Sequence, residues 1–167
     1  MGFAMLEAGT VRAKNSSNIL LKNLLDTYVG AIVYYLVGYA IANNAEGGII
    51  GHYHFASIGF SEDDYLKWII QYSICSNIPT IVAGSLAERT FADTYMFFAL
   101  LITGFIYPVA AAWIWGGGWL KVLGFRDFAG AGVVHLLGGV CGMVGTIILG
   151  PRLGVFGKID IKLSQAN

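Results

Sequence analysis

Three residues in the last third of the chain have side chains suited to binding a cation or exchanging a proton: Trp115, Asp127 and His135. Trp115 precedes three glycines, Asp127 precedes an apolar run, and His135 lies inside that run. If the run is helical from Asp127 onward, His135 lies roughly 12 Å further along the helix axis. An ionisable ring at such a depth in a membrane is a candidate functional residue.

Each of these three residues has two interpretations. Trp115 is either an aromatic residue of the membrane interface or a platform whose ring face attracts a cation. Asp127 is the N-cap of a helix, and the same carboxylate could also attract cations to an outer vestibule. His135 is either a neutral histidine bonded to a neighbouring helix or a pore residue that offers a hydrogen bond to a small polar solute.

Small residues surround His135 at helical spacing, three, four or seven positions away. They are Ala131, Gly132, Gly138, Gly139 and Gly142. A stripe of small residues lets another backbone, or a narrow lumen, come close to the helix.

The composition indicates an integral membrane protein. The chain has 167 residues, of which 56% are hydrophobic and only 12% are charged, whereas a soluble domain has about 25% charged residues. The net charge of zero argues against a nucleic-acid partner. We find no enzyme signature and predict no cofactor. His52 and His54 lack a third ligand nearby, so we predict no metal site.

The hydropathy pattern predicts an all-α fold, a polytopic membrane helix bundle with about five transmembrane helices. Residues 1–8 are predicted to be only the end of the first helix, and the start of that helix is expected to be missing. The other four are predicted at residues 17–42, 65–86, 91–113 and 128–149. Pro79 predicts a kink in the third helix.

Basic residues gather in the loops that follow the first, third and fifth predicted helices. They are Arg12, Lys14, Arg89, Arg152, Lys158 and Lys162. The positive-inside rule places these loops in the cytoplasm, so Trp115 and Asp127 should face outside. Lys22 and Asp26, four residues apart in the second helix, are expected to form a local ion pair near the headgroups.

Several motifs along the chain match one family. They are GFAMLEAG, VRAKN and ILLKN near the start, SLAER at residues 85–89, and WGGGWL, DFAGAGVVH and ILGPR toward the end. Over essentially its whole length the chain resembles the ammonium transporter (Amt) family, and it is less similar to the Rhesus-glycoprotein branch. The resemblance implies eleven membrane helices in two inverted halves, a homotrimer with one pore per subunit, and a location in the plasma membrane. Residues 1–167 would form a single, incomplete membrane domain, the first of these halves.

The resemblance also implies roles for individual residues. Trp115 is similar to the external aromatic residue that recruits ammonium, Asp127 to the acid required beside it, and His135 to the first of two pore histidines. Gln71 and Ile74 occupy the outer-gate segment.

The chain departs from the family pattern at two positions. The outer gating phenylalanine of the family falls at Ile74, which can close a hydrophobic constriction but has no ring to stack on a cation. The histidine usual before the tryptophan motif is Ala112 here.

The function implied is ammonium transport across the lipid bilayer. Ammonium would be recruited at the outer vestibule and ammonia conducted past the histidine, because an ion pays a large Born cost in an apolar lumen. One alternative is an ammonium sensor or receptor that uses the same pore. Another is a non-conducting fragment, because five helices lack the half that closes the pore.

Overall fold

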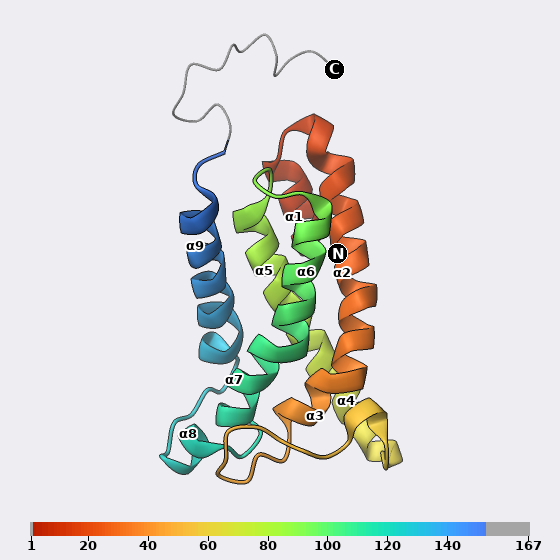
Figure 1. Cartoon of the computed structure of the whole chain (residues 1–167), viewed down its shortest axis with the longest axis vertical. Helices are drawn as coiled ribbons and strands as arrows, with labels where there is room; N and C mark the ends of the chain where they lie inside the picture. The colour runs from red at the N-terminus through yellow and green to blue at the C-terminus, as the bar shows by residue number, and fades with distance from the viewer. Residues whose placement is uncertain (1, 153–167) are drawn as a thin grey trace.

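A computed structural model describes residues 2–152 as a bundle of helices that lie side by side along one long axis (Figure 1). The described residues contain no strand, and the prediction of an all-α fold is confirmed. The α-helices are α1 (Gly2–Thr10), α2 (Ser16–Val33), α3 (Tyr39–Ala42), α4 (Glu62–Cys75), α5 (Asn77–Leu86), α6 (Ala92–Leu101), α7 (Tyr107–Ile114), α8 (Trp119–Val122) and α9 (Leu137–Leu149). Short 3-10 or π-helical segments are η1 (Ala13–Asn15), η2 (Tyr34–Gly38), η3 (Phe55–Ser57), η4 (Ile102–Ile106) and η5 (Ala131–Leu136).

Three helical stretches of the described residues are long and apolar enough to cross a membrane: Ala13–Ala42, Asp93–Val122 and Ala131–Leu149. They coincide with the predicted helices at 17–42, 91–113 and 128–149. The π-helical segments η2 and η4 interrupt the first two without ending them, so α2 continues into α3 and α6 continues into α7.

The third predicted helix, 65–86, is instead two helices separated at Ser76. Proline has no N–H to donate, so Pro79 cannot bond the carbonyl oxygen of Cys75, four residues earlier, and its ring crowds that carbonyl. Helix α4 therefore ends at Cys75 and α5 begins at Asn77. The interruption comes from Pro79, as expected, but lies one turn before it.

Glycines allow close packing between α5 and α9. A Cβ atom at Gly142 would lie 2.6 Å from the Ser85 hydroxyl oxygen, and one at Gly138 would lie 3.1 Å from Ile81. The predicted approach of another element to this stripe is thus confirmed for these two glycines. At Gly139 a Cβ atom would meet nothing within 4 Å, so this glycine faces away from α5.

Lys22 and Asp26 do not form the expected pair. Asp26 is buried and accepts a hydrogen bond from the hydroxyl of Tyr95 in α6. The Lys22 ammonium donates to the backbone oxygen of Thr90 at 3.3 Å and lies 5.3 Å from the centre of the Tyr95 ring. The partners of both side chains thus lie in α6 and in the turn before it, which i,i+4 spacing within α2 alone could not predict. The second carboxylate oxygen of Asp26 has no hydrogen-bond partner within the described residues.

The two ends of the bundle differ in their loops (Figure 1). The α1–α2 and α5–α6 turns and the end of α9 lie at one end, which carries Arg12, Lys14, Arg89 and Arg152. The segment between α3 and α4 and the segment around α8 lie at the other end. The predicted basic residues Lys158 and Lys162 fall outside the described residues.

Candidate functional site

The chain turns sharply after Trp115, the C-cap residue that follows α7, and the three glycines that follow make the turn possible. A Cβ atom at Gly116 would lie 2.2 Å from the backbone oxygen of Ala42, and one at Gly118 would lie 2.5 Å from that of Ala112. Any larger residue at these two positions would have to displace backbone. Ala112 itself is completely buried beneath the turn.

This turn is also bonded to the segment that follows α3. The backbone N–H of Ala45 donates to the Gly116 oxygen at 2.9 Å, and that of Gly47 donates to the Gly117 oxygen at 2.7 Å. The glycine sequence therefore positions Trp115 by joining the ends of two long helices.

Trp115 and Asp127 are in direct contact. The indole Nε1–H of Trp115 donates to the backbone oxygen of Asp127 at 2.8 Å. The ring is half-buried and packs against a core that includes Val133 and Val134. Since one edge of the indole is bonded and the ring packs on the core, its orientation is defined by these contacts.

The Asp127 carboxylate caps the helix that carries His135. Its Oδ1 accepts the backbone N–H groups of Gly130 and Ala131 at 2.8 and 2.9 Å, and its Oδ2 accepts those of Gly132 and Val133, both at 2.8 Å. The helix begins at Ala131, not at residue 128 as predicted, so Asp127 caps it from four residues before the first helical residue. Helix N-termini leave such N–H groups unpaired, and a carboxylate satisfies them well.

These four hydrogen bonds also set the ionisation of Asp127. Partial burial of the carboxyl raises its pKa, but the four backbone N–H donors outweigh this effect and lower the pKa below its ordinary value. The side chain is therefore ionised at neutral pH, and its negative charge is compensated by the start of the helix.

His135 lies on the side of its helix that the described residues leave open. The residue is exposed, and its ring has no hydrogen bond to any of residues 2–152. Because residues 127–130 are not helical, His135 lies four residues, about one turn, beyond the start of the helix at Ala131, and not eight residues into a helix as predicted. The segments η5 and α9 also expose apolar residues: Leu136, Val140, Met143 and Ile147.

Gln71 belongs to a separate polar network below the α3–α4 segment. Its side-chain amide forms two hydrogen bonds of 2.9 Å with the amide of Asn43, one in each direction, and its oxygen also accepts the Tyr34 hydroxyl at 3.1 Å. The parts that Asn43 and Tyr34 play in this network were not predicted. The sequence offered a signal for Asn43, which is a polar residue at the end of an apolar helix. It offered none for Tyr34, which is buried and stands within an apolar run.

Ile74 is half-buried and packs against the same hydrophobic core as Trp115. The structure thus brings Trp115 and Asp127 into contact and gives Ile74 and Trp115 a common core. Gln71 is bonded to Asn43 and Tyr34, and His135 contacts none of the others through a hydrogen bond.

Comparisons with known proteins agree on one family. The family model described as "Ammonium Transporter Family" matches residues 1–167. "Ammonium transporter 1 member 3" of Solanum lycopersicum is 45% identical over 167 residues, covering 93% of this chain and 36% of that protein. "Ammonium transporter 3" of Dictyostelium discoideum is 43% identical over 160 residues, covering 94% of this chain and 37% of that protein.

The structure resembles a solved protein of the same kind. The chain matches the "Sensor Amt Protein" with a TM-score of 0.85 and 33% sequence identity, over 94% of this chain and 42% of the other. The chain spans about a third of the length of the curated relatives quoted above. It belongs to the Ammonium Transporter Family.

Proposed function

We propose that this chain contributes to ammonium transport across a membrane. It would provide the outer recruitment site, formed by Trp115 and Asp127, and one wall of a pore that carries His135. The observation that supports this most directly is the hydrogen bond between the Trp115 indole and the Asp127 backbone. It joins an aromatic ring to the start of the helix that bears the histidine. The curated relatives quoted above are named as transporters, which favours transport over sensing and over an enzymatic role.

The Trp115 ring would attract ammonium through its face. Its Nε1–H edge is already bonded to Asp127, so the ring face is the part of the side chain left for a ligand. A cation over an indole face gains about 1–2 kcal/mol when it is partly desolvated. This is enough to concentrate ammonium at the vestibule without holding it there.

Asp127 would act mainly through position. Both carboxylate oxygens are occupied by backbone N–H groups, so a cation would not need to bind the carboxylate directly. The carboxylate holds the start of the His135 helix, and the backbone oxygen of the same residue orients Trp115.

His135 would assist passage of the neutral form. An ammonium ion in an apolar lumen loses its hydration at great cost, whereas ammonia loses only hydrogen bonds. The ammonium ion would therefore transfer its proton to a water molecule in the vestibule and enter the lumen as ammonia. A neutral imidazole could then replace one hydrogen bond that ammonia loses on leaving water.

Ile74 would close the outer end of this path as an apolar constriction. It lacks the ring of the family's phenylalanine, so we assign cation attraction to Trp115 alone. Gln71 would hold α4 in place through Asn43. We further propose that the chain is one part of a larger membrane domain, that the subunits form a homotrimer, and that the protein works in the plasma membrane.

Uptake of labelled methylammonium, in a host without ammonium uptake of its own, tests this assignment. We expect Trp115→Leu to raise the KM by about fivefold to thirtyfold, the loss of about 1–2 kcal/mol of cation attraction. His135→Ala should lower the maximal rate.

Trp119→Leu and His52→Ala are matched controls, because they change exposed residues of the same types at the same end of the bundle. Neither control should alter uptake. If Trp115→Leu and His135→Ala both transport as well as the unaltered protein, these residues do not have the proposed roles.

A further inference from the structure

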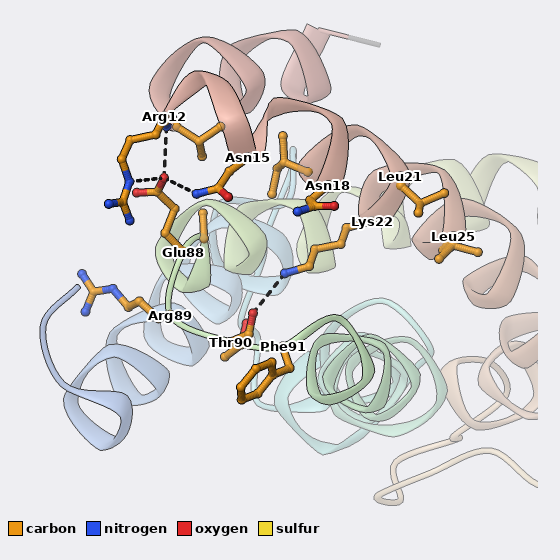
Figure 2. A pocket seen from close by; sticks show the side chains of 13 residues that line it. Arg12, Asn15, Asn18, Leu21, Lys22, Leu25, Glu88, Arg89, Thr90 and Phe91 are labelled. Atoms are coloured by element: carbon orange, nitrogen blue, oxygen red, sulfur yellow. Dashed lines mark hydrogen bonds and ion pairs between the residues drawn. The ribbon is translucent and has the colours of Figure 1, made fainter. Parts of the chain in front are cut away.

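A groove opens between the start of α2 and the α5–α6 turn, at the end of the bundle that carries the basic loops (Figure 2). Its volume of about 440 Å³ lies within the range of about 300–1,000 Å³ typical of small-ligand sites. Nothing in the proposed transport path uses it. Its lining combines apolar side chains with charged and polar ones, and this combination indicates what it could bind.

The groove has apolar side chains on both of its sides. They are Leu21 and Leu25 of α2 and, across the groove, Phe91 just before α6 (Figure 2). The Leu21 side chain is 55% exposed and that of Phe91 is 86% exposed. A small water-soluble anion would gain nothing from these surfaces, whereas a hydrocarbon chain laid along them would bury apolar area.

The single acid of the groove is fully compensated. Oε1 of Glu88 accepts the backbone N–H and Nε–H of Arg12, both at 3.0 Å, and the Asn15 amide at 2.7 Å. Burial raises the pKa of the Glu88 carboxyl, but these hydrogen bonds and the Arg12 charge outweigh it and lower the pKa. Glu88 therefore stays ionised and paired, and it presents little unpaired negative charge to a ligand.

Hydrogen-bond donors beside these apolar side chains are left for a ligand. Lys22 extends across the groove toward Thr90 and donates to its backbone oxygen at 3.3 Å (Figure 2). An ammonium group has three N–H donors, so two are left. Asn18, one turn earlier on the same helix, is exposed and makes no side-chain hydrogen bond within residues 2–152. Arg89 is directed toward the end of α9 instead, where its Nη1 donates to the Gly150 oxygen at 2.7 Å.

We propose that this groove binds an anionic phospholipid of the leaflet at the basic end of the bundle. The lipid phosphate would accept hydrogen bonds from Lys22 and Asn18, and an acyl chain would lie against Leu21, Leu25 and Phe91. Basic side chains beside a membrane helix attract anionic headgroups in this way. The inference concerns a lipid site and does not depend on what the pore conducts.

Native mass spectrometry of the purified protein tests the proposal with two probes, phosphatidylglycerol and phosphatidylcholine of identical acyl chains. We expect phosphatidylglycerol to bind more tightly. Lys22→Gln should weaken its binding about fivefold, as expected for one basic side chain near an anionic headgroup. Asn18→Ala should weaken it less, and Lys22→Arg should retain it. The Asn18 side chain has no hydrogen bond to lose within residues 2–152, so this variant reports on binding even if Lys22→Gln unfolds.

Lys14→Gln is the matched control, because Lys14 is an exposed lysine at the same end of the bundle that does not line the groove. It should change phosphatidylglycerol binding by less than twofold. Three results would overturn the proposal: equal binding of the two lipids, an equal effect of Lys14→Gln and Lys22→Gln, or protein-to-protein crosslinks from a photoreactive group at Leu21 that show the groove filled by polypeptide.

Discussion

Replacing Asp127 by asparagine is the most direct test of how the candidate site is held together. In the structure each carboxylate oxygen accepts two backbone N–H groups at the start of the His135 helix. Asparagine keeps the shape but presents one oxygen and one NH₂ group. Two of the four backbone donors would then face another donor, and the negative charge at the helix N-terminus would be lost.

The expected loss of stability follows from these contacts. A hydrogen bond to a charged group contributes about 1.5–3 kcal/mol, and two would be lost. The interaction of the charge with the helix dipole adds about 0.3–1 kcal/mol. Because water can reach the exposed Ala131 N–H and compensate in part, we expect the lower end of the sum, about 3–4 kcal/mol in the free energy of unfolding.

Two measurements check this expectation: unfolding of the purified protein by SDS titration, and hydrogen–deuterium exchange of residues 130–133. The exchange of these amides should accelerate in Asp127→Asn. Asp93→Asn is the control, because Asp93 lies in the first turn of α6 and makes no hydrogen bond through its side chain within the described residues. It should cost less than about 1 kcal/mol.

The pH dependence gives an independent check on the same group. A carboxyl whose pKa is lowered by folding stabilises the protein above its unfolded pKa of about 4, and this contribution is lost as the pH falls below that value. The unaltered protein should lose it on acidification, and Asp127→Asn should not. Equal protection of residues 130–133 in the two proteins, with equal stability, would show that the carboxylate does not hold this helix.

Two further predictions concern the packing of the two ends. Gly116→Ala should destabilise the protein by more than about 2 kcal/mol, because its Cβ would lie 2.2 Å from the Ala42 oxygen. Gly139→Ala, whose Cβ would meet nothing within 4 Å, should be neutral or stabilising by up to about 1 kcal/mol. Thermal unfolding compares the two variants, and equal melting temperatures would contradict the prediction for Gly116→Ala. Glu88→Gln should lower the free energy of unfolding by about 1–3 kcal/mol, because it weakens the hydrogen bonds to Arg12. Because folding lowers the Glu88 pKa, the unaltered protein loses stability as the pH falls from 6 to 3, and this loss should be smaller in the variant.

Local pattern predicted the elements whose signal lies within one segment. The helices at 17–42 and 91–113 are long apolar runs, and the structure contains both. The small residues before and after His135 predicted close packing, which Gly138 and Gly142 show against α5. These features depend on periodicity and residue size, which the sequence displays directly.

Features that depend on a partner from another helix could not be predicted. The pairing of Gln71 with Asn43 joins residues 28 positions apart, and Tyr95 takes the place of Lys22 as the partner of Asp26. The predicted start of the last helix was also wrong. The helix begins at Ala131, its N-cap residue is the left-handed Gly130, and Asp127 caps it from three residues before that N-cap position. The roles assigned to Trp115, Asp127, His135, Gln71 and Ile74 in transport stay predictions.

The interruption at Ser76 leaves the two parts of one predicted helix with different partners. Helix α4 is attached through Gln71 to Asn43, at the end of α3, and α5 is packed against the glycines of α9. Since Pro79 cannot continue the backbone hydrogen bonds across this joint, a small tilt of α4 need not shear the α5–α9 contact. The Ile74 side chain can therefore shift with α4 while Gly138 and Gly142 keep their contacts with α5.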